Sequence, residues 1–331
     1  MSTHDLSAFE TAIEDYWHGR PPSSLEDVMT LYGVLATAVS GGELYRTSSA
    51  LEDFVDDGRL VTIHLDLTGD PTYETVNVDV LRRDQLDTLG YAVKSSGRGA
   101  DYSLTQAGSV NGNDPAEVAG KTHLNRIRLW CGYDSVRSTI DDGHPDAWVV
   151  EALGTVFEKD SAAISRIADD IEALLSGGEP TVVTVAMRID TADLDRYDET
   201  GVETFYPGGL DVLETAMQRY KTKNATDRNL SGSRTSEGVA TGLVTGGEER
   251  VVGTPESPLE TFSIKHPDVQ PGLRRTASWR NYPVADRTAQ LIAKGSDLLE
   301  RCALRSGGME TYALPYFAGE ITAPKARTLY R

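Results

Sequence analysis

Two short alternating runs in the first third of the chain predict an antiparallel hairpin. In residues 59–68, RLVTIHLDLT, apolar side chains fall on one face and polar side chains on the other, and a GDPT turn follows. Alternation resumes over residues 76–80 with three valines. A period of two is typical of a strand with one buried face, so we expect two paired strands whose polar face meets solvent.

Helical spacing of apolar residues recurs up to residue 200. Residues 23–42 begin with a serine cap and end at a Gly-Gly pair, which is the pattern of a helix. Residues 160–178 are predicted as the clearest helix, because five apolar residues from Ile164 to Leu175 form one stripe that ends at a Gly-Gly pair. Further predicted elements are helices over 121–140 and 144–157, a buried strand over 181–189, and a long loop with at most one short strand over 94–115.

The last third of the chain carries a second set of signals. The predicted elements are a turn and helix over 203–223, a polar, mobile loop over 224–238, a hairpin over 242–254, a turn and helix over 278–308 stopped by Gly307-Gly308, a strand over 310–317 and a helix starting near 322. In the hairpin we expect Leu243 and Val244 to pair with Val251 and Val252 across the Gly246-Gly247 turn. These elements predict an α+β fold of mixed helices and antiparallel strands, and neither a Rossmann nor a P-loop fold.

Charge divides the chain unevenly. The net charge is −19, and only 8 of the 32 basic residues are Lys, which predicts a halophilic source. Residues 1–200 hold 36 acidic and 15 basic residues, and residues 201–331 hold 15 and 17. We therefore expect an acidic N-terminal domain over 1–200 and a near-neutral region over 201–331. The second region either meets a polyanion or is buried against other protein, and charge alone leaves both open.

The compartment follows from what the chain lacks. The acidic start, MSTHDLSAFETAIEDY, does not resemble a signal peptide, and no apolar run approaches the ~18–20 residues of a membrane span. A cytoplasmic protein without membrane contact is expected. Cys131 and Cys302 have no Cys or His nearby, so both are predicted to be buried residues that bind no metal.

Enzymatic motifs are weak throughout. AGKT (119–122) has Pro115 where a phosphate loop needs Gly. His64 and Asp66 share a strand face, but no further ligand is tied to them, so a solvated face is the simpler interpretation. We predict neither catalysis nor a cofactor. A halophilic nucleic-acid hydrolase using such residues, or a pure protein–protein scaffold, stays an alternative.

Basic residues of the second region are the candidate nucleic-acid contacts. They gather in QRYKTKNATDRNLSGSR (218–234), on the hairpin, and in LRRTASWRNYP (273–283), where Trp279 and Tyr282 accompany them. The candidates are Arg219, Lys221, Lys223, Arg228, Arg234, Arg250, Arg274, Arg275 and Arg280. Arginine beside aromatic residues suits phosphate contact and base stacking. The alternatives are a solvated loop for the first segment and a turn packed on the core for the second, and for Trp279 we expect the core.

Several blocks resemble one known family. They are ATGLVTGGEERVVGTPESPLETFSIKH, ASWRNYPVADRTAQLI and CALRSGGMETYALPYFAGEITAPKARTLY, with KTHLNRIRLWCGYDSV and HPDAWVVEAL upstream. This series is similar to the large subunit of subtype I-B CRISPR surveillance complexes (Cascade) in its haloarchaeal form. Family members are longer and continue into a helical C-terminal region, so this chain resembles a short or truncated form.

The resemblance implies a non-enzymatic role in antiviral defence. Family members lie near the 5′ handle of the guide RNA, beside the backbone and handle-capping subunits. They help to recognise the motif that flanks the target (PAM), to open the double-stranded DNA and to recruit the helicase–nuclease. Base pairing with the guide reads the target sequence while protein reads the flanking motif.

Overall fold

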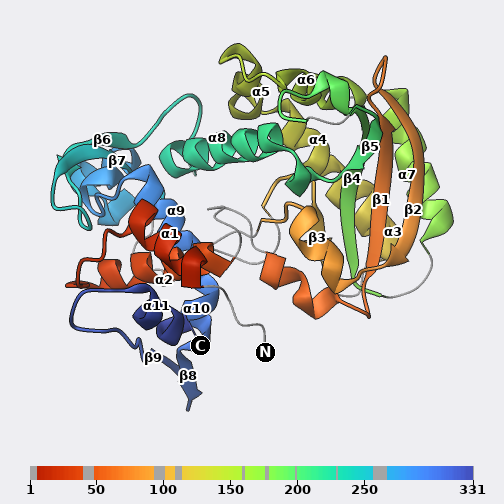
Figure 1. Ribbon diagram of the computed structural model, residues 1–331. Helices are drawn as coiled ribbons and strands as arrows, with labels where there is room; N and C mark the ends of the chain where they lie inside the picture. Colours follow the sequence, from red (N-terminus) through yellow and green to blue (C-terminus); the bar gives the residue numbers. More distant parts are fainter. Residues whose placement is uncertain are drawn as a thin grey trace. The chain divides into compact units, whose positions relative to one another are not determined.

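The computed structural model describes residues 6–39, 48–92, 101–108, 114–158, 161–175, 179–197, 200–228, 230–255 and 267–330. These residues form two compact units (Figure 1). The sheet unit contains the described residues of 48–92 and 101–220, and the helical unit those of 6–39 and 221–330. The units are not divided at residue 200, because the N-terminal helices share a core with the C-terminal segments.

The sheet unit is built on one five-stranded mixed sheet. Its strands are β1 (Arg59–Asp66), β2 (Thr72–Val80), β3 (Gln106–Gly108), β4 (Thr181–Asp190) and β5 (Val202–Phe205). The order is β2-β1-β4-β3, with β5 also paired to β4. The predicted β1–β2 hairpin is confirmed, and β3 is the short strand expected within 94–115, of which 93–100 and 109–113 lie outside the described residues. The β1–β4 pair is parallel, whereas the other pairs are antiparallel.

The expectation that β1 has one solvated face is wrong at Thr62, whereas His64 and Asp66 on the same face are half-exposed. Thr62 is buried, and it pairs in register with Thr184 of β4 on the same face of the sheet. On the adjacent β4, Thr184 is also buried, and its Oγ1 lies 2.7 Å from the Thr105 Oγ1. Hydroxyl groups on this face are therefore satisfied inside the protein rather than by water.

Helices and helical turns surround the sheet. They are η1 (Ser48–Phe54), η2 (Arg83–Thr88), α3 (Pro115–Glu117), η3 (Val118–His123), α4 (Leu124–Gly132), α5 (Asp134–Asp141), α6 (Ala147–Val156), α7 (Ala162–Leu174), η4 (Thr191–Asp193) and η5 (Pro207–Gly209). Helix α7 is capped at its start, since the Ser161 Oγ accepts a hydrogen bond from the Ile164 N–H. The AGKT residues lie in η3, a π-helical turn leading into α4, rather than in a phosphate loop.

Within the described residues, the helical unit packs five whole α-helices and the end of a sixth together with two small hairpins. Its elements are α1 (Leu6–Tyr16), α2 (Leu25–Val39), the end of α8 (Asp211–Asp227), β6 (Glu237–Thr241), β7 (Glu248–Val252), η6 (Pro267–Val269), η7 (Pro271–Leu273), η8 (Arg275–Arg280), α9 (Asp286–Lys294), α10 (Ser296–Arg301), β8 (Ala303–Ser306), β9 (Met309–Tyr312) and α11 (Ala323–Tyr330). The α2 and α9 backbones nearly touch: a Cβ on Gly33 would lie 1.9 Å from the Leu291 carbonyl oxygen. Glycine is therefore required at this crossing.

Three details of the last third differ from expectation. Gly307 and Gly308 form the β8–β9 turn instead of ending a helix, because α10 already ends at Arg301. The residues predicted as loop from 224 begin inside α8, which runs to Asp227. Cys302 is only half-buried, whereas Cys131 is buried as predicted.

The β6–β7 hairpin is present, but its predicted register is wrong. Val251 pairs with Gly238 and Val252 with Glu237, while Leu243 lies in the connecting turn. Hydrogen bonds between Gly242 and both Gly246 and Gly247 close this turn, and Gly246 has a positive φ of 67°. The pairing that involves Leu243 is instead with Pro283, whose carbonyl accepts its N–H at 2.9 Å. Among the described residues no helix is both long and apolar enough to cross a bilayer.

Candidate nucleic-acid interface

A buried pair of serines joins the segments that carry most of the basic candidates. The Ser236 and Ser278 side chains are fully buried, and their Oγ atoms lie 2.8 Å apart. The Ser278 hydroxyl donates to the Gly253 carbonyl at 2.7 Å, and the Trp279 N–H donates to the Ser236 Oγ at 3.2 Å. Donor and acceptor counting therefore requires Ser236 to donate to Ser278. We call this set the serine hub.

The serine hub also caps the end of α8. The last carbonyls of a helix have no partner within the helix. Here the Ser236 N–H donates to the Thr226 carbonyl at 2.7 Å, and the Thr254 N–H donates to the Ala225 carbonyl at 2.8 Å. The Thr254 hydroxyl donates to the Asn224 carbonyl at 2.5 Å. Strand β7, which precedes Thr254, thus has a fixed position relative to the helix end.

Trp279 lies on the hairpin rather than deep in the core. The residue is half-buried, and its ring covers Gly238 so closely that a Cβ there would be 2.6 Å from the ring. The Arg280 guanidinium lies 4.8 Å from the centroid of the indole. Tyr282 is buried, and burial, followed by the charge of Glu26, raises the pKa of its hydroxyl. An arginine held against an indole is the combination expected for stacking.

The exposed arginine candidates differ in whether other residues of the protein already bind their guanidinium groups. Arg274 and Arg280 are exposed, and no carboxylate partner is found for either within the part of the chain that the structure describes. Arg250 is bound by Glu237, and Arg234 by the Ser231 side chain and carbonyl. The last two are therefore exposed but already engaged.

The remaining candidates are more strongly tied to the protein. Arg219 belongs to the sheet unit, where Asp142 and Ser138 bind its guanidinium. Lys223 is exposed and lies 3.5 Å from the Asp227 carboxylate. The other three are half-buried and have interactions within the protein: Lys221, Arg228 and Arg275. Their common feature is that a phosphate would compete with an existing partner.

The two compact units also differ in charge, although less than residues 1–200 and 201–331 do. The sequence ranges of the helical unit carry 19 acidic and 17 basic residues, and those of the sheet unit carry 32 and 15. The serine hub lies in the nearly neutral unit. A polyanion is repelled less by this unit than by the sheet unit.

His64 and Asp66, the weaker candidates from the sequence, are bound by residues that do not form a metal site. The His64 Nε2 lies 3.1 Å from the Asn77 amide, and Asp66 is bound by Arg188 and Thr68. Hydrogen bonds from Thr68 and then Arg188 outweigh the effect of desolvation and lower the pKa of Asp66. No group of three or more His, Cys, Asp or Glu residues within the described ranges is placed to hold a metal ion.

Sequence reasoning missed the hub itself. Ser236, Gly253 and Ser278 are small residues in segments far apart in the chain, and no periodicity marks them. The only signal in the sequence is their position beside the basic residues. The β6–β7 hairpin (Figure 1) is joined to this hub by backbone hydrogen bonds, among them the Gly253 N–H donating to the Ser236 carbonyl at 2.7 Å.

The α+β fold and the basic residues of the nearly neutral unit do not by themselves define a family, and comparison with known proteins does. The chain is 58% identical, over all of its length, to CRISPR-associated protein Cas8b of Haloferax volcanii. The match covers 47% of that protein, so the chain spans about half the length of its curated relative. No family model and no solved structure matches the chain. The chain is thus homologous to part of Cas8b, which confirms the resemblance to the type I-B large subunit.

Proposed function

We propose that this chain acts as a non-catalytic large-subunit component of a type I-B CRISPR surveillance complex. In this role it contributes to binding of guide RNA and target DNA, to recognition of the flanking motif and to recruitment of the helicase–nuclease. The observation that carries the proposal is the 58% identity to Cas8b along the entire chain. Backbone and handle-capping subunits are the proposed neighbours.

The serine hub supports the assignment of the nucleic-acid contacts. Arg274 and Arg280 are the leading candidates because both are exposed and neither must leave a carboxylate partner among the described residues. Trp279 beside Arg280 offers an aromatic face in addition to charge. In concentrated salt, phosphate contacts lose the free energy of counterion release, so bidentate hydrogen bonds and stacking carry more of the affinity. The other seven basic candidates are proposed as secondary contacts.

Binding of labelled double-stranded DNA and guide-type RNA by the full chain tests this assignment. The double variant Arg274→Ala/Arg280→Ala removes two charges, so the slope of log K against log salt should fall by about 2. Affinity at the lowest salt should fall about tenfold or more. Arg305→Ala is the matched control, since Arg305 is exposed on the same unit but held by Glu300 and Glu310. Equal slopes for the double variant and the unmodified chain would refute the assignment.

Assembly is tested in the cell. The tagged chain is purified from a haloarchaeal host in concentrated KCl, its partners are identified by mass spectrometry, and bound RNA is sequenced. The proposal predicts CRISPR-associated subunits together with short guide RNA. Recovery of neither would refute the function, whatever the outcome of the arginine substitutions.

A further inference from the structure

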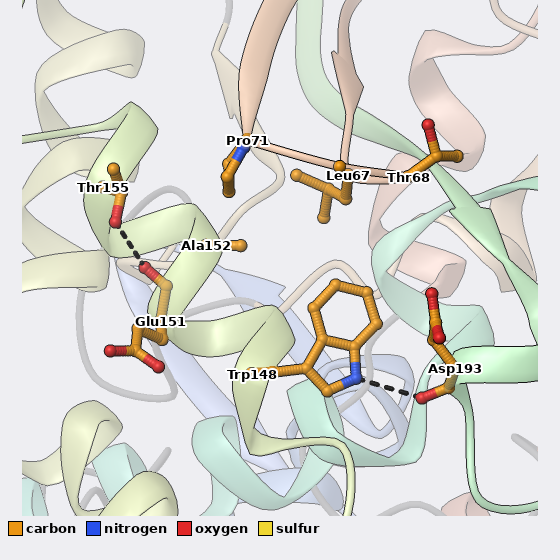
Figure 2. Close-up of a pocket in the computed structure, with 9 residues that line it drawn as sticks. Leu67, Thr68, Pro71, Trp148, Glu151, Ala152, Thr155 and Asp193 are labelled. Atoms are coloured by element: carbon orange, nitrogen blue, oxygen red, sulfur yellow. Dashed lines mark hydrogen bonds between the residues drawn. The ribbon is translucent and has the colours of Figure 1, made fainter.

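A second feature of the molecule lies on the acidic sheet unit and has no part in the serine hub. It is an open pocket of about 560 Å³ between the β1–β2 turn, helix α6 and the turn η4 (Figure 2). The lining residues are Leu67, Thr68, Gly69, Pro71, Trp148, Glu151, Ala152, Thr155 and Asp193. All of them belong to the same compact unit.

Helical spacing accounts for one wall of the pocket. Trp148, Ala152 and Thr155 follow one another at intervals of four and three, so one face of α6 presents them together. Trp148 is half-buried and its indole N–H donates to the Asp193 carbonyl at 3.2 Å, which fixes the ring against η4. Leu67 and Ala152 are buried and supply an apolar floor. Figure 2 shows the indole facing the space bordered by these residues and Pro71.

The two threonine hydroxyls of the pocket have hydrogen-bond partners within the protein, whereas its carboxylates are exposed. The Thr68 hydroxyl donates to Asp66, and the Thr155 hydroxyl donates to the Glu151 carbonyl. The Asp193 carboxylate, by contrast, has no ion-pair partner in the described part of the chain and is exposed. In Figure 2 this carboxylate lies beside the indole on the side of Thr68, whereas the Glu151 carboxylate points away from the indole.

An aromatic face, an apolar floor and a carboxylate at the edge together suit a cationic side chain with an apolar stem. The stem fits the floor, the cation stacks on the indole, and the carboxylate pairs with it. Arginine suits this arrangement better than lysine, because its planar guanidinium stacks and also binds a carboxylate in bidentate fashion. A nucleic-acid strand is disfavoured, since the sequence of this unit holds 32 acidic and 15 basic residues.

We propose that this pocket receives an arginine side chain from a protein partner. The acidic unit is complementary in charge to a basic segment of such a partner, and the pocket selects one residue within that segment. The pocket is separate from the serine hub, so the proposal does not depend on nucleic-acid binding. It assigns the sheet unit a specific contact in assembly rather than a role as inert scaffold.

Fluorine NMR of the full chain labelled with 5-fluorotryptophan tests the proposal. The four tryptophans give separate signals, and Trp148→Phe identifies the one in the pocket. The probes are N-acetyl-arginine amide and the uncharged isostere N-acetyl-citrulline amide, at constant ionic strength. We expect a saturable shift of the Trp148 signal with the arginine probe and at least tenfold weaker binding of the citrulline probe.

Asp193→Asn supplies the decisive variant, because the side chain is exposed and its removal should leave the fold intact. It should weaken binding of the arginine probe at least fivefold and leave the citrulline titration unchanged. Asp57→Asn, at an exposed position outside the pocket, is the matched control and should change neither. Equal binding of both probes, no shift with either, or a Trp148 shift produced by oligothymidylate instead would each overturn the proposal.

Discussion

Replacing Gly33 by Ala is expected to separate two helices of the helical unit. The added Cβ would lie 1.9 Å from the carbonyl oxygen, 2.4 Å from the carbonyl carbon and 2.8 Å from the Cα of Leu291. All three atoms are backbone, so no rotamer change relieves the overlap. Gly295 reinforces the constraint, since a Cβ there would lie 2.8 Å from the Gly33 nitrogen.

The size of the effect follows from the movement required. Ordinary contact begins at 3.4 Å, so α2 and α9 must separate by about 1.5 Å. A gap of that size removes more than half of the dispersion energy between facing atoms, and Val34, Leu291 and Ile292 at this interface are almost fully buried. Overpacking usually costs ~1–3 kcal/mol, and a cost of ~3–4 kcal/mol is expected here because backbone atoms must move. The gain of ~1 kcal/mol in helix propensity reduces the net loss to ~2–3 kcal/mol.

Urea unfolding in molar KCl, followed by circular dichroism, measures this loss. Gly154→Ala is the matched control, because it also lies within a helix but meets nothing within 4 Å of its added Cβ. The control should be neutral or stabilised by up to ~1 kcal/mol. A Gly33→Ala protein within ~0.5 kcal/mol of the unmodified chain would refute the close approach of α2 and α9.

Three further outcomes are expected. Ser278→Ala should lower the free energy of unfolding by ~1–3 kcal/mol, because the substitution leaves the buried Gly253 carbonyl and Ser236 hydroxyl without their partner. Urea unfolding measures this loss, and an unchanged midpoint would contradict the prediction. Gly253→Ala should destabilise the protein through the same segment, since the added Cβ would lie 2.0 Å from the Ser236 Oγ. The thermal midpoint of this variant should fall below that of Gly247→Ala, whose added Cβ meets nothing within 4 Å, and equal midpoints would count against the overlap. Burial, followed by the charge of Arg126, lowers the pKa of His123 to about 4. As the pH falls from about 6.5 to about 4, this histidine is therefore protonated in the unfolded chain before it is protonated in the folded one, and the free energy of unfolding should decline by up to ~1.4 kcal/mol per pH unit. His123→Gln should reduce that pH dependence. Parallel pH profiles for His123→Gln and the unmodified chain would contradict it.

Local hydrophobic pattern was sufficient for the regular elements. The alternation in 59–68 predicts β1, the largely apolar run in 181–189 predicts β4, and the apolar stripe with its Gly-Gly stop in 160–178 predicts α7. These predictions succeed because period and capping depend on residues close together in the chain. The family resemblance is likewise carried by contiguous blocks of sequence, and the match to Cas8b confirms it.

Contacts between residues far apart in the chain determined the burial of polar side chains and the register of the strands. Thr62, which the alternating pattern assigned to solvent, is buried, because this face of the sheet is covered by a distant segment that places Thr105 against Thr184, the β4 partner of Thr62. The register of β6 and β7 depends on the Val252–Val284 bridge and on the hydrogen bond from Leu243 to Pro283, neither of which a local turn rule contains. Register and burial are set by the partner strand and not by the strand alone.

The candidate nucleic-acid interface also depends partly on the sequence alone and partly on the tertiary structure. Sequence by itself determined which side chains are basic and which aromatic residues accompany them. Only the tertiary structure decided that Arg219 is held by Asp142 while Arg274 is exposed, because an ion pair depends on where a distant carboxylate lies. The serine hub and the Trp148 pocket likewise exist only once segments far apart in the chain are brought together, so no pattern in the sequence marks them.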